Sequence, residues 1–524
     1  MSGTILGPLW FLTLASTALA IGEDDKVTAL PGLLFTPNFA SYSGYLNAST
    51  DGTLQMHYWL TESRSDPSKD PILVWYNGGP GCSSFGCMFE ELGPFYVTRD
   101  GKSVFENVHG WNQKANVLAP ESPVGVGFSY QKGVRYFTKA NDDYTAQQNY
   151  LSLKDFFSRV QTKFAGRDFY LSGESYAGVY VPTLAKLLVD GIMSGDFPNS
   201  NFKGIAVGNG YLHVKHILNS QVLWSIYHGL LGLENLDAVK ARCCGGTGEV
   251  DHCQFSDHIT CDNGLDYDTD GSWCGNMTAP LMNLDDNMDS YNYNQDCYTG
   301  TGAGEKMKSF KRSLTRRRRP NRKAANPADT HWQDSTDPFH GYPCWGEDAV
   351  KWRDLNLTYE DCNDPMYDNY NVTYVATNDV FDHIIRKYNQ SFRILIFNGD
   401  VDTICNWLGD AWLVRAVAEK AKMKITLPHQ QWYFRNQTAG YIQRYANGNN
   451  SLILDLMSVK MIAAFMFSKA AGGPDYNDHT IVDPTPAPLP LIDDHESSTK
   501  GVTGMQSIFL ATSISAILIL GRAN

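Results

Sequence analysis

Positive charge is scarce in this chain. Its 524 residues include 43 Lys or Arg against 56 Asp or Glu, which gives a formal net charge of -13. The exception is residues 306–323, where basic side chains are concentrated and include the run Arg316 to Arg319. A basic cluster alone suggests nucleic-acid binding, but the secretory features described below argue against that partner. A solvated charged loop or a site for a basic-site protease remains open.

Clusters with the spacing of metal ligands are also missing. The eleven cysteines gather mainly between Cys243 and Cys362, in a polar region rich in Asn and Gly. This pattern indicates disulfides formed in an oxidising compartment rather than a metal site, so we expect no metal and no cofactor. Because the count is odd, at least one thiol is unpaired within the chain.

A turn of small residues around Ser175 is the most informative feature that is present. Residues 173–178 read Gly-Glu-Ser-Tyr-Ala-Gly, after the apolar run 169–171 and before a helical apolar pattern that starts at Tyr180. A strand that turns tightly into a helix pushes such a serine outward, which is the geometry of a nucleophile elbow. The usual spacing places Gly where Ala177 stands, so a chance Gly/Ser turn is the alternative.

A glycine-rich loop lies upstream of this turn. The strand predicted at residues 72–76 runs into Asn77-Gly78-Gly79-Pro80-Gly81-Cys82-Ser83-Ser84. Acyl transfer requires two N–H donors at the developing oxyanion, one from the residue after the nucleophile and one from an early glycine loop. Tyr176 and Gly79 are the expected pair, and an ordinary surface turn is the alternative.

Together these segments resemble the serine carboxypeptidase family. The resemblance rests on NGGPGCSS, on Phe89 to Pro94, on ESPVGVGFSY at 121–130, on GESYAG, on Val207 to Gly210 and on Phe397 to Trp407, and it spans about residues 25–470. It implies an α/β-hydrolase fold with a disulfide-rich cap insertion. It also implies release of C-terminal amino acids from peptides, an acidic optimum and no metal.

The resemblance assigns roles to individual residues. Ser175 is the expected nucleophile, and Asp402 is the acid that orients a histidine. Asn77, Glu91 and Glu174 are expected to hold the terminal carboxylate of the substrate, because two close carboxyl groups keep one proton that can be donated. For Glu91, a solvated helix acid is the alternative.

The same resemblance predicts which cysteines form disulfides. Cys82 is expected to pair with Cys362, and Cys243, Cys244, Cys253 and Cys261 to close a local loop. Cys405, near Asp402, is either a reactive thiol or a buried, inert one.

The catalytic histidine expected by this family is not found in its usual place. Only His429, His479 and His495 follow Asp402, and none has the expected Gly-His surroundings. Residues 452–460 are predicted as the last strand and residues 461–467 as the last helix, with no turn between them, although a connection of about two to six residues is normal. We expect a His-bearing loop to have been lost between Lys460 and Met461, through a skipped exon or a faulty gene model, which leaves the printed chain nearly inactive.

The chain has the marks of the secretory pathway. Residues 1–20 are predicted to be a signal peptide, apolar from Ile5 and ending in Ala18-Leu19-Ala20, although they lack Lys or Arg. We expect a secreted or lysosomal glycoprotein. Its Asn-x-Ser/Thr acceptors are Asn47, Asn276, Asn356, Asn371, Asn389, Asn436 and Asn449.

We expect one large domain with an insertion. The core is predicted at 21–211 and 347–473, with the cap at 212–346, whose helical pattern runs from Val222 to Leu231, and a basic linker at 306–323 that maturation can excise. Residues 474–524 read as a polar linker and an apolar tail. The sixteen residues from Met505 to Leu520 are short for a spanning helix, so a spanning anchor, a glycolipid-anchor signal and a disordered tail stay open.

The expected partners are peptide or protein C-termini, with a membrane tether and a homodimer as further alternatives. Two other functions remain open: a non-catalytic peptide-binding or protective protein, and an acyltransferase.

Overall fold

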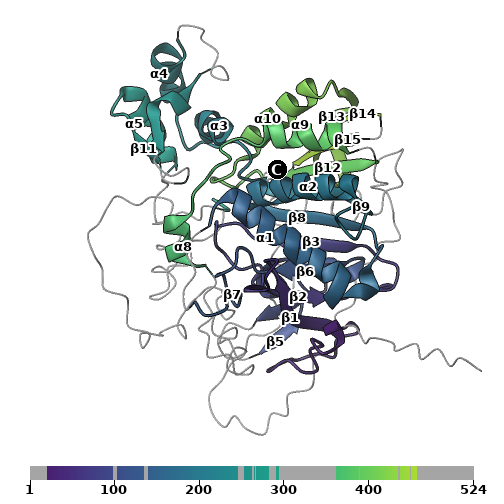
Figure 1. Ribbon diagram of the computed structural model, residues 1–524. Coiled ribbons are helices and arrows are strands. Elements are labelled where there is room, and N and C mark those ends of the chain that lie inside the picture. The colour runs from purple at the N-terminus through teal and green to yellow at the C-terminus, as the bar shows by residue number, and fades with distance from the viewer. Residues whose placement is uncertain are drawn as a thin grey trace, which may run out of the picture. The chain divides into compact units, whose positions relative to one another are not determined.

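The computed structural model describes residues 21–97, 103–134, 140–245, 253–261, 265, 267–282, 291–293, 362–388, 390–434, 437–448 and 450–456. The predicted signal peptide, the basic linker, the expected junction at Lys460–Met461 and the apolar tail therefore lie outside the described residues. Figure 1 shows the described elements, coloured from the N-terminus to the C-terminus.

A single eleven-stranded sheet organises the described core. Its strands lie in the order β1 (Ser41–Asn47), β2 (Leu54–Thr61), β6 (Asn116–Pro120), β3 (Ile72–Tyr76), β8 (Phe169–Ser175), β9 (Phe202–Gly210), β12 (Phe392–Asn398), β15 (Asn450–Leu456), β14 (Gln437–Asn447) and β13 (Lys424–Phe434), and β7 (Tyr130–Gln131) pairs with β2. From β6 to β15 neighbouring strands run parallel, whereas both flanks are antiparallel. The carboxyl ends of the central strands therefore meet at one edge, where ligands bind in open α/β sheets.

Both faces of the central sheet are buried. In β3, Ile72, Val74 and Tyr76 belong to one hydrophobic cluster, while Leu73 and Trp75 belong to another on the opposite face. Side chains alternate along a strand, so an unbroken apolar run is what a strand covered on both sides requires. Helices α1 (Asp142–Asp155) and α2 (Ala177–Ser194) lie over the first of these faces (Figure 1).

The other described α-helices all come after β9 in the chain. They are α3 (Val214–Tyr227), α4 (Leu233–Cys243), α5 (Trp273–Met282), α8 (Asp364–Asn369), α9 (Asn378–Lys387) and α10 (Trp407–Lys420). Two small hairpins, β4 (Phe95–Val97) with β5 (Val104–Glu106) and β10 (Ile259–Cys261) with β11 (Tyr267–Thr269), complete the set of described strands.

Residues 214–282 form a small unit with its own apolar cluster. Val222, Val239, Phe255 and Leu281 are among its buried members. The predicted helix at 222–231 was misplaced, because α3 begins at Val214, eight residues earlier. His213 caps the helix, accepting a hydrogen bond from the amide of His216 at 3.3 Å.

Candidate active site

Ser175 occupies a tight turn between β8 and α2. Its φ of 56° is a left-handed conformation that is uncommon for a residue with a side chain. A Cβ on Gly173 would lie 2.5 Å from the carbonyl oxygen of Tyr76, and one on Gly178 would lie 2.6 Å from the amide nitrogen of Tyr211. Only glycine fits at both positions, whereas the place held by Ala177 tolerates a methyl group. The departure from the usual spacing therefore does not disturb the elbow.

The glycine loop after β3 packs directly on this elbow. A Cβ on Gly78 would lie 2.5 Å from the amide nitrogen of Tyr176 and 2.8 Å from the Cβ of Ser175. Gly79 follows with a φ of 108°, which favours glycine. The structure thus brings together the two backbone segments expected to supply the oxyanion donors.

A disulfide fastens the same loop to the segment that begins α8. Cys82 is bonded to Cys362, as predicted from the resemblance. Beside it, the amide of Asn363 donates to the carbonyl of Gly81 at 2.9 Å. The loop is therefore held by these two links as well as by its packing against the elbow.

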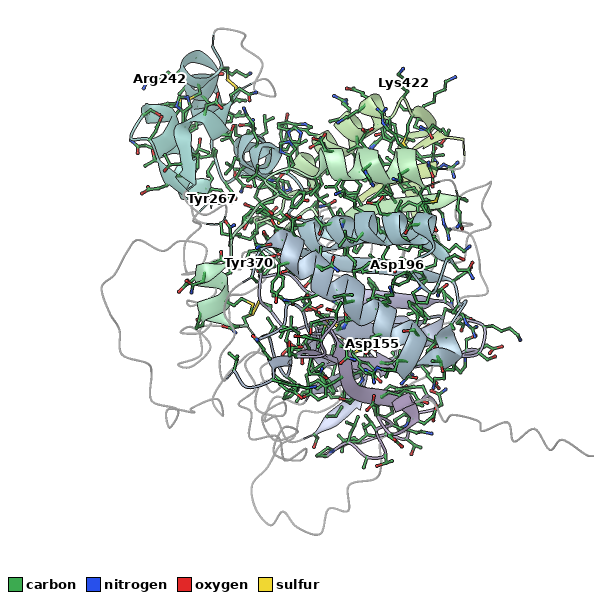
Figure 2. All side chains as sticks on the ribbon, in the orientation of Figure 1. Asp155, Asp196, Arg242, Tyr267, Tyr370 and Lys422 are labelled. Atoms are coloured by element: carbon green, nitrogen blue, oxygen red, sulfur yellow. A yellow bond between two sulfur atoms is a disulfide. The ribbon has the colours of Figure 1, made fainter. Side chains whose placement is uncertain are left out.

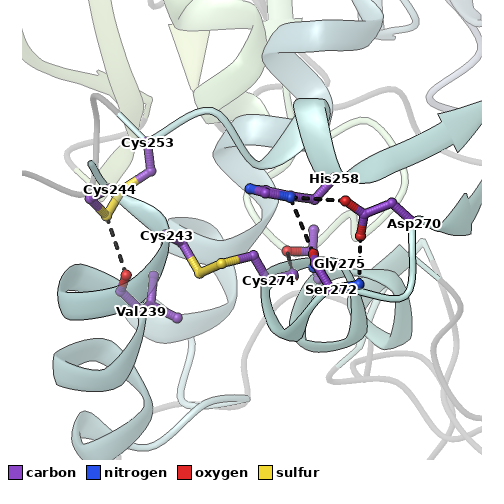
Figure 3. Close-up of a disulfide and its surroundings, with 10 residues drawn as sticks. Val239, Cys243, Cys244, Cys253, His258, Asp270, Ser272, Cys274 and Gly275 are labelled. Carbon is purple, nitrogen blue, oxygen red and sulfur yellow. Dashed lines mark hydrogen bonds and ion pairs between the residues drawn. A yellow bond between two sulfur atoms is a disulfide. The ribbon is translucent and has the colours of Figure 1, made fainter.

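Two further disulfides lie in the unit formed by residues 214–282 (Figure 3). They join Cys243 to Cys274 and Cys244 to Cys253. The predicted group omitted Cys274 and included Cys261, whose side chain lies outside the described part of the chain. Sequence spacing missed Cys274 because it lies on α5, which only the fold brings back against the end of α4.

Asn77, Glu91 and Glu174 form one hydrogen-bonded group beside the elbow. The side-chain amide of Asn77 donates to Glu91 Oε1 at 2.9 Å and to Glu174 Oε1 at 3.4 Å. Trp75 Nε1 donates to Asn77 Oδ1 at 2.8 Å, which fixes the orientation of that amide. Asn77 is buried, whereas Glu91 is exposed, so the group opens towards solvent on the side of Glu91.

Glu174 has a strongly perturbed acidity. Burial, and then the negative charge of Asp402, raise its pKa to about 7, against a smaller lowering effect from its hydrogen bond with Glu91. A carboxyl group in this state keeps its proton in mildly acidic solution and can donate it to another carboxylate.

Asp402 lies in the loop that follows β12. Its Oδ1 accepts hydrogen bonds from the amides of Ile404 at 2.6 Å and of Cys405 at 3.1 Å. Asn209, at the end of β9, donates to the carbonyls of Gly399 at 3.2 Å and of Cys405 at 3.1 Å. Sequence reasoning did not give Asn209 this role. In the structure its φ of 37° shows that its backbone is constrained.

A second buried acid lies behind this loop. Asp410, on α10, accepts hydrogen bonds from the side chain of Asn398 at 2.8 Å and from the amide of Gly210 at 3.2 Å. Burial raises its pKa to about 8, with a further contribution from Asp402. No sequence signal distinguished this aspartate from the solvated acids of a helix.

Two unbonded thiols are buried near the site. They belong to Cys405, which was predicted, and to Cys87, which was not. Burial raises the pKa of both thiols, and nearby carboxylates raise it further: Asp402 acts on Cys405, and Glu91 on Cys87. Because the thiolate is the reactive form, this environment favours the inert alternative for Cys405.

Tyr291 is a site neighbour that sequence reasoning missed. The residue as a whole is 45% exposed, but burial and then the charges of Asp402 and Glu174 raise the pKa of its hydroxyl well above the usual range. The hydroxyl therefore lies near both carboxylates. The next residues also face the site, since the amide of Tyr293 lies 3.4 Å from the carbonyl of Val401. Residues 291–293 carry no motif, so only the fold reveals them.

The structure places one of the three histidines that follow Asp402. His429 lies on β13, where it is exposed and stacks on Tyr441 with ring centroids 5.3 Å apart. Strands β15 and β14 separate β13 from β12, which leads to Asp402. At about 4.8 Å per strand, His429 is too distant to act on Ser175. His479 and His495 lie outside the described residues.

Three of the predicted glycosylation acceptors are described. Asn276 and Asn371 are exposed, whereas Asn47 is half-buried and accepts a hydrogen bond from Gln55 at 2.9 Å. Asn356, Asn389, Asn436 and Asn449 lie outside the described residues. None of the helices in the described part of the chain is both long enough and apolar enough to span a bilayer.

Comparisons with known proteins agree with this geometry. The family model described as serine carboxypeptidase matches residues 31–464. The chain is 44% identical to serine carboxypeptidase ctsa-3.1 of Caenorhabditis elegans over 88% of each protein. It is 34% identical to the lysosomal protective protein of Mus musculus, covering 81% of this chain and 88% of that protein.

A solved structure supports the fold. The chain superimposes on a prohormone-processing carboxypeptidase from Saccharomyces cerevisiae with a TM-score of 0.60, covering 84% of this chain and 92% of that one at 19% identity. The predicted α/β-hydrolase fold is confirmed, and the chain belongs to the serine carboxypeptidase family.

Proposed function

We propose that the chain binds the C-terminal carboxylate of a peptide at Asn77, Glu91 and Glu174 and presents the last peptide bond to Ser175. One observation carries this proposal: the carboxyl group with a raised pKa, Glu174, is the residue immediately before the serine of the elbow. A pocket that binds a carboxylate next to a nucleophile selects the end of a chain, because an internal peptide bond offers no carboxylate there.

The proposed reaction is acyl transfer through a serine ester. The Ser175 hydroxyl gives its proton to water as Oγ forms a bond to the carbonyl carbon, and the amides of Gly79 and Tyr176 stabilise the resulting oxyanion. The C–N bond then breaks, and the terminal amino acid leaves after its nitrogen takes up a proton. Water hydrolyses the ester and regenerates the serine.

Turnover by the printed chain is proposed to be slow. The sequence has no Gly-His segment between Lys460 and Met461, and His429 lies at the outer edge of the sheet. Loss of the histidine of a serine triad costs on the order of a millionfold in kcat, and the oxyanion hole leaves only a residual rate. This feature favours a second candidate, a peptide-binding or protective protein that keeps the pocket without rapid turnover.

The proposed site of action is the secretory pathway or the lysosome. The predicted signal peptide, the acceptor asparagines and the disulfides support it, as does similarity to a protein named lysosomal protective protein. Acidic surroundings also suit Glu174, whose pKa of about 7 leaves it protonated there.

One experiment separates these functions. Affinity for a peptide with a free C-terminus and for its C-terminal amide is measured by calorimetry, and released amino acid is measured by mass spectrometry. Carboxypeptidase action predicts release that Ser175→Ala abolishes, whereas a binding protein gives affinity for the free carboxylate without product. Equal affinity for acid and amide would refute the pocket. A product joined to an added amine or alcohol would indicate an acyltransferase.

Sequencing the transcript across the codons for Ser458 to Ala463 decides the expected activity. An added Gly-His segment predicts ordinary turnover, and an uninterrupted Lys460–Met461 junction predicts the slow form.

A further inference from the structure

A buried carboxylate lies directly behind the elbow. Asp142, in the first turn of α1, is 1% exposed. Its Oδ1 accepts hydrogen bonds from the hydroxyls of Tyr176 at 2.8 Å and Tyr370 at 3.0 Å. Its Oδ2 accepts from Thr373 N at 2.6 Å, Thr373 Oγ1 at 3.1 Å and Tyr374 N at 2.9 Å. Five donors therefore converge on one side chain.

These donors come from two parts of the chain. One part contains an expected oxyanion donor, and the other fastens the glycine loop that contains the second expected donor. Tyr176 is the residue whose backbone amide is proposed to bind the oxyanion. Residues 370–374 follow α8, whose leading residues Cys362 and Asn363 hold the glycine loop. Tyr370, labelled in Figure 2, belongs to this return segment. The side chain of Asp142 thus joins the elbow to the segment that holds the glycine loop after β3.

The ring of Tyr176 is also held by packing. It stacks on Tyr211 with centroids 5.6 Å apart and meets Tyr370 edge-on at 5.5 Å. The amide of Tyr211 donates to the carbonyl of Ser175 at 2.7 Å. With the ring confined on both sides and its hydroxyl anchored, the Cα of Tyr176 and the plane of its amide have little freedom.

A purely structural role would not require a charge at this position. Burying a carboxylate is costly unless its oxygens are hydrogen-bonded, and apolar side chains can fill such a space at lower cost. A carboxylate instead imposes direction, because each donor must point at an oxygen. Direction matters most for a catalytic amide, because the amide stabilises the transition state only when its N–H points at the oxyanion.

We propose that Asp142 is a positioning residue of the oxyanion hole, acting through the hydroxyl of Tyr176 to fix the amide of that residue. The proposal rests on the proposed acyl transfer at Ser175. It adds a residue that neither contacts the substrate nor belongs to the motifs of the elbow.

Two matched substitutions test this role. Tyr176→Phe and Tyr370→Phe each remove one hydroxyl that donates to the same oxygen of Asp142 and keep the aromatic ring. Tyr370 also donates to Thr145 Oγ1 at 3.2 Å, so its loss is at least as costly to stability. Each change removes one of the five hydrogen bonds to Asp142, which the fold should tolerate. Only Tyr176→Phe frees a residue of the oxyanion hole.

The first readout is acylation of Ser175 by a p-nitrophenyl ester of a blocked amino acid. Imidazole is added as an external base, the full-length chain is used, and Ser175→Ala sets the background. We expect Tyr176→Phe to lower the acylation rate by about tenfold with unchanged peptide affinity, less than the hundred- to thousandfold loss of a whole oxyanion donor. Tyr370→Phe should lower the rate less, by about twofold, because Tyr176 keeps its own bond to Asp142 and the backbone of Tyr370 supplies no proposed oxyanion donor.

The second readout needs no catalysis. Hydrogen–deuterium exchange is followed in the peptide that spans residues 173–180. Tyr176→Phe should speed exchange there, whereas Tyr370→Phe should speed it only around residues 366–374.

The outcomes separate the two proposals. Equal acylation of wild type and Ser175→Ala would refute the proposed function, and the exchange data would then decide the role of Asp142 alone. Exchange in the 173–180 peptide that is no faster in Tyr176→Phe than in Tyr370→Phe would overturn that role. Equal acylation rates of the two variants, in an active protein, would overturn it as well.

Discussion

Asn209 and Gly399 exchange two hydrogen bonds across the ends of β9 and β12. The amide of Gly399 donates to Asn209 Oδ1 at 2.9 Å, and Asn209 Nδ2 donates to the carbonyl of Gly399 at 3.2 Å. The side chain of Asn209 thus continues the pairing of two parallel strands beyond their last backbone bond. It holds the start of the loop that carries Asp402.

This pairing predicts a difference between two substitutions of Asn209. Asn209→Ala loses the hydrogen bonds and leaves a Cβ at a φ of 37°, whereas Asn209→Gly loses the same bonds but relieves the backbone. We expect the alanine variant to unfold with a free energy lower by about 2–3 kcal/mol, and the glycine variant to recover about 1 kcal/mol of that loss. Urea denaturation measures both, and equal stabilities would show that the backbone at 209 is unstrained.

Binding of a C-terminal peptide should depend on pH through Glu174. Below its pKa of about 7 the carboxyl is protonated and can donate to the peptide carboxylate, whereas above it two negative charges repel. Affinity should therefore fall by about tenfold or more between pH 5 and pH 8, a change of about 1.4 kcal/mol. Calorimetry across this range measures it.

Glu174→Gln is the informative variant for that titration. It keeps a donor at every pH, so its affinity should be nearly flat between pH 5 and pH 8. Glu90→Gln, one residue before Glu91, should keep the wild-type profile. A wild-type affinity that does not change with pH would contradict the role of Glu174.

Stability should fall with rising pH because of Asp410. In the folded protein burial raises the pKa of this carboxyl from 3.8 to about 8. The folded state therefore holds the proton more tightly than the unfolded state, and this stabilisation, complete below about pH 4, is lost as pH rises to about 8. Asp410→Asn should remove on the order of 1–3 kcal/mol of the loss between pH 5 and pH 8.

Asp379→Asn is the control for this effect. Asp379 is exposed and pairs with Lys420 at 2.5 Å, and this hydrogen bond lowers its pKa rather than raising it. His213 acts in the opposite direction, since burial and His216 lower its pKa to about 4, and its contribution is lost as pH falls from about 6.5. Thermal unfolding should show the Asp410 effect growing steadily from about pH 4 to pH 8, whereas the His213 effect should appear only below about pH 6.5.

Cleavage in the basic linker should leave two chains joined covalently. The Cys82–Cys362 bond connects the parts before and after residues 306–323. Trypsin-limited digestion of the folded protein should therefore give one band on a non-reducing gel and two after reduction. Two bands without reductant would contradict this linkage, and a single reduced band would show that the linker is protected.

The motifs around the reacting groups could be predicted because their chemistry is local. Gly173 to Gly178 and Asn77 to Ser84 specify tight turns at strand ends through residue size alone, and both turns are found where predicted. The strand at Ile72–Tyr76 was equally clear, since five apolar residues in succession suit only a strand buried on both faces.

Features that depend on distant partners could not be predicted. Cys274 pairs with Cys243 only because α5 returns to α4, and Tyr291 approaches Asp402 without any motif. Asp142 and Asp410 resemble ordinary helix acids in the sequence, although the fold buries both. Asp142 accepts five hydrogen bonds, whereas Asp410 accepts two.

The sequence by itself determined the family, because a nucleophile turn, a glycine loop and an acid loop are each written in a few adjacent residues. Only the tertiary structure decided which acids lie together, which thiols are buried and which side chains contact the residue after the elbow serine. These properties arise from burial and from contacts between residues that are not neighbours in sequence, such as Asp142 with Tyr176 and Tyr370, and such contacts leave no local pattern in the chain.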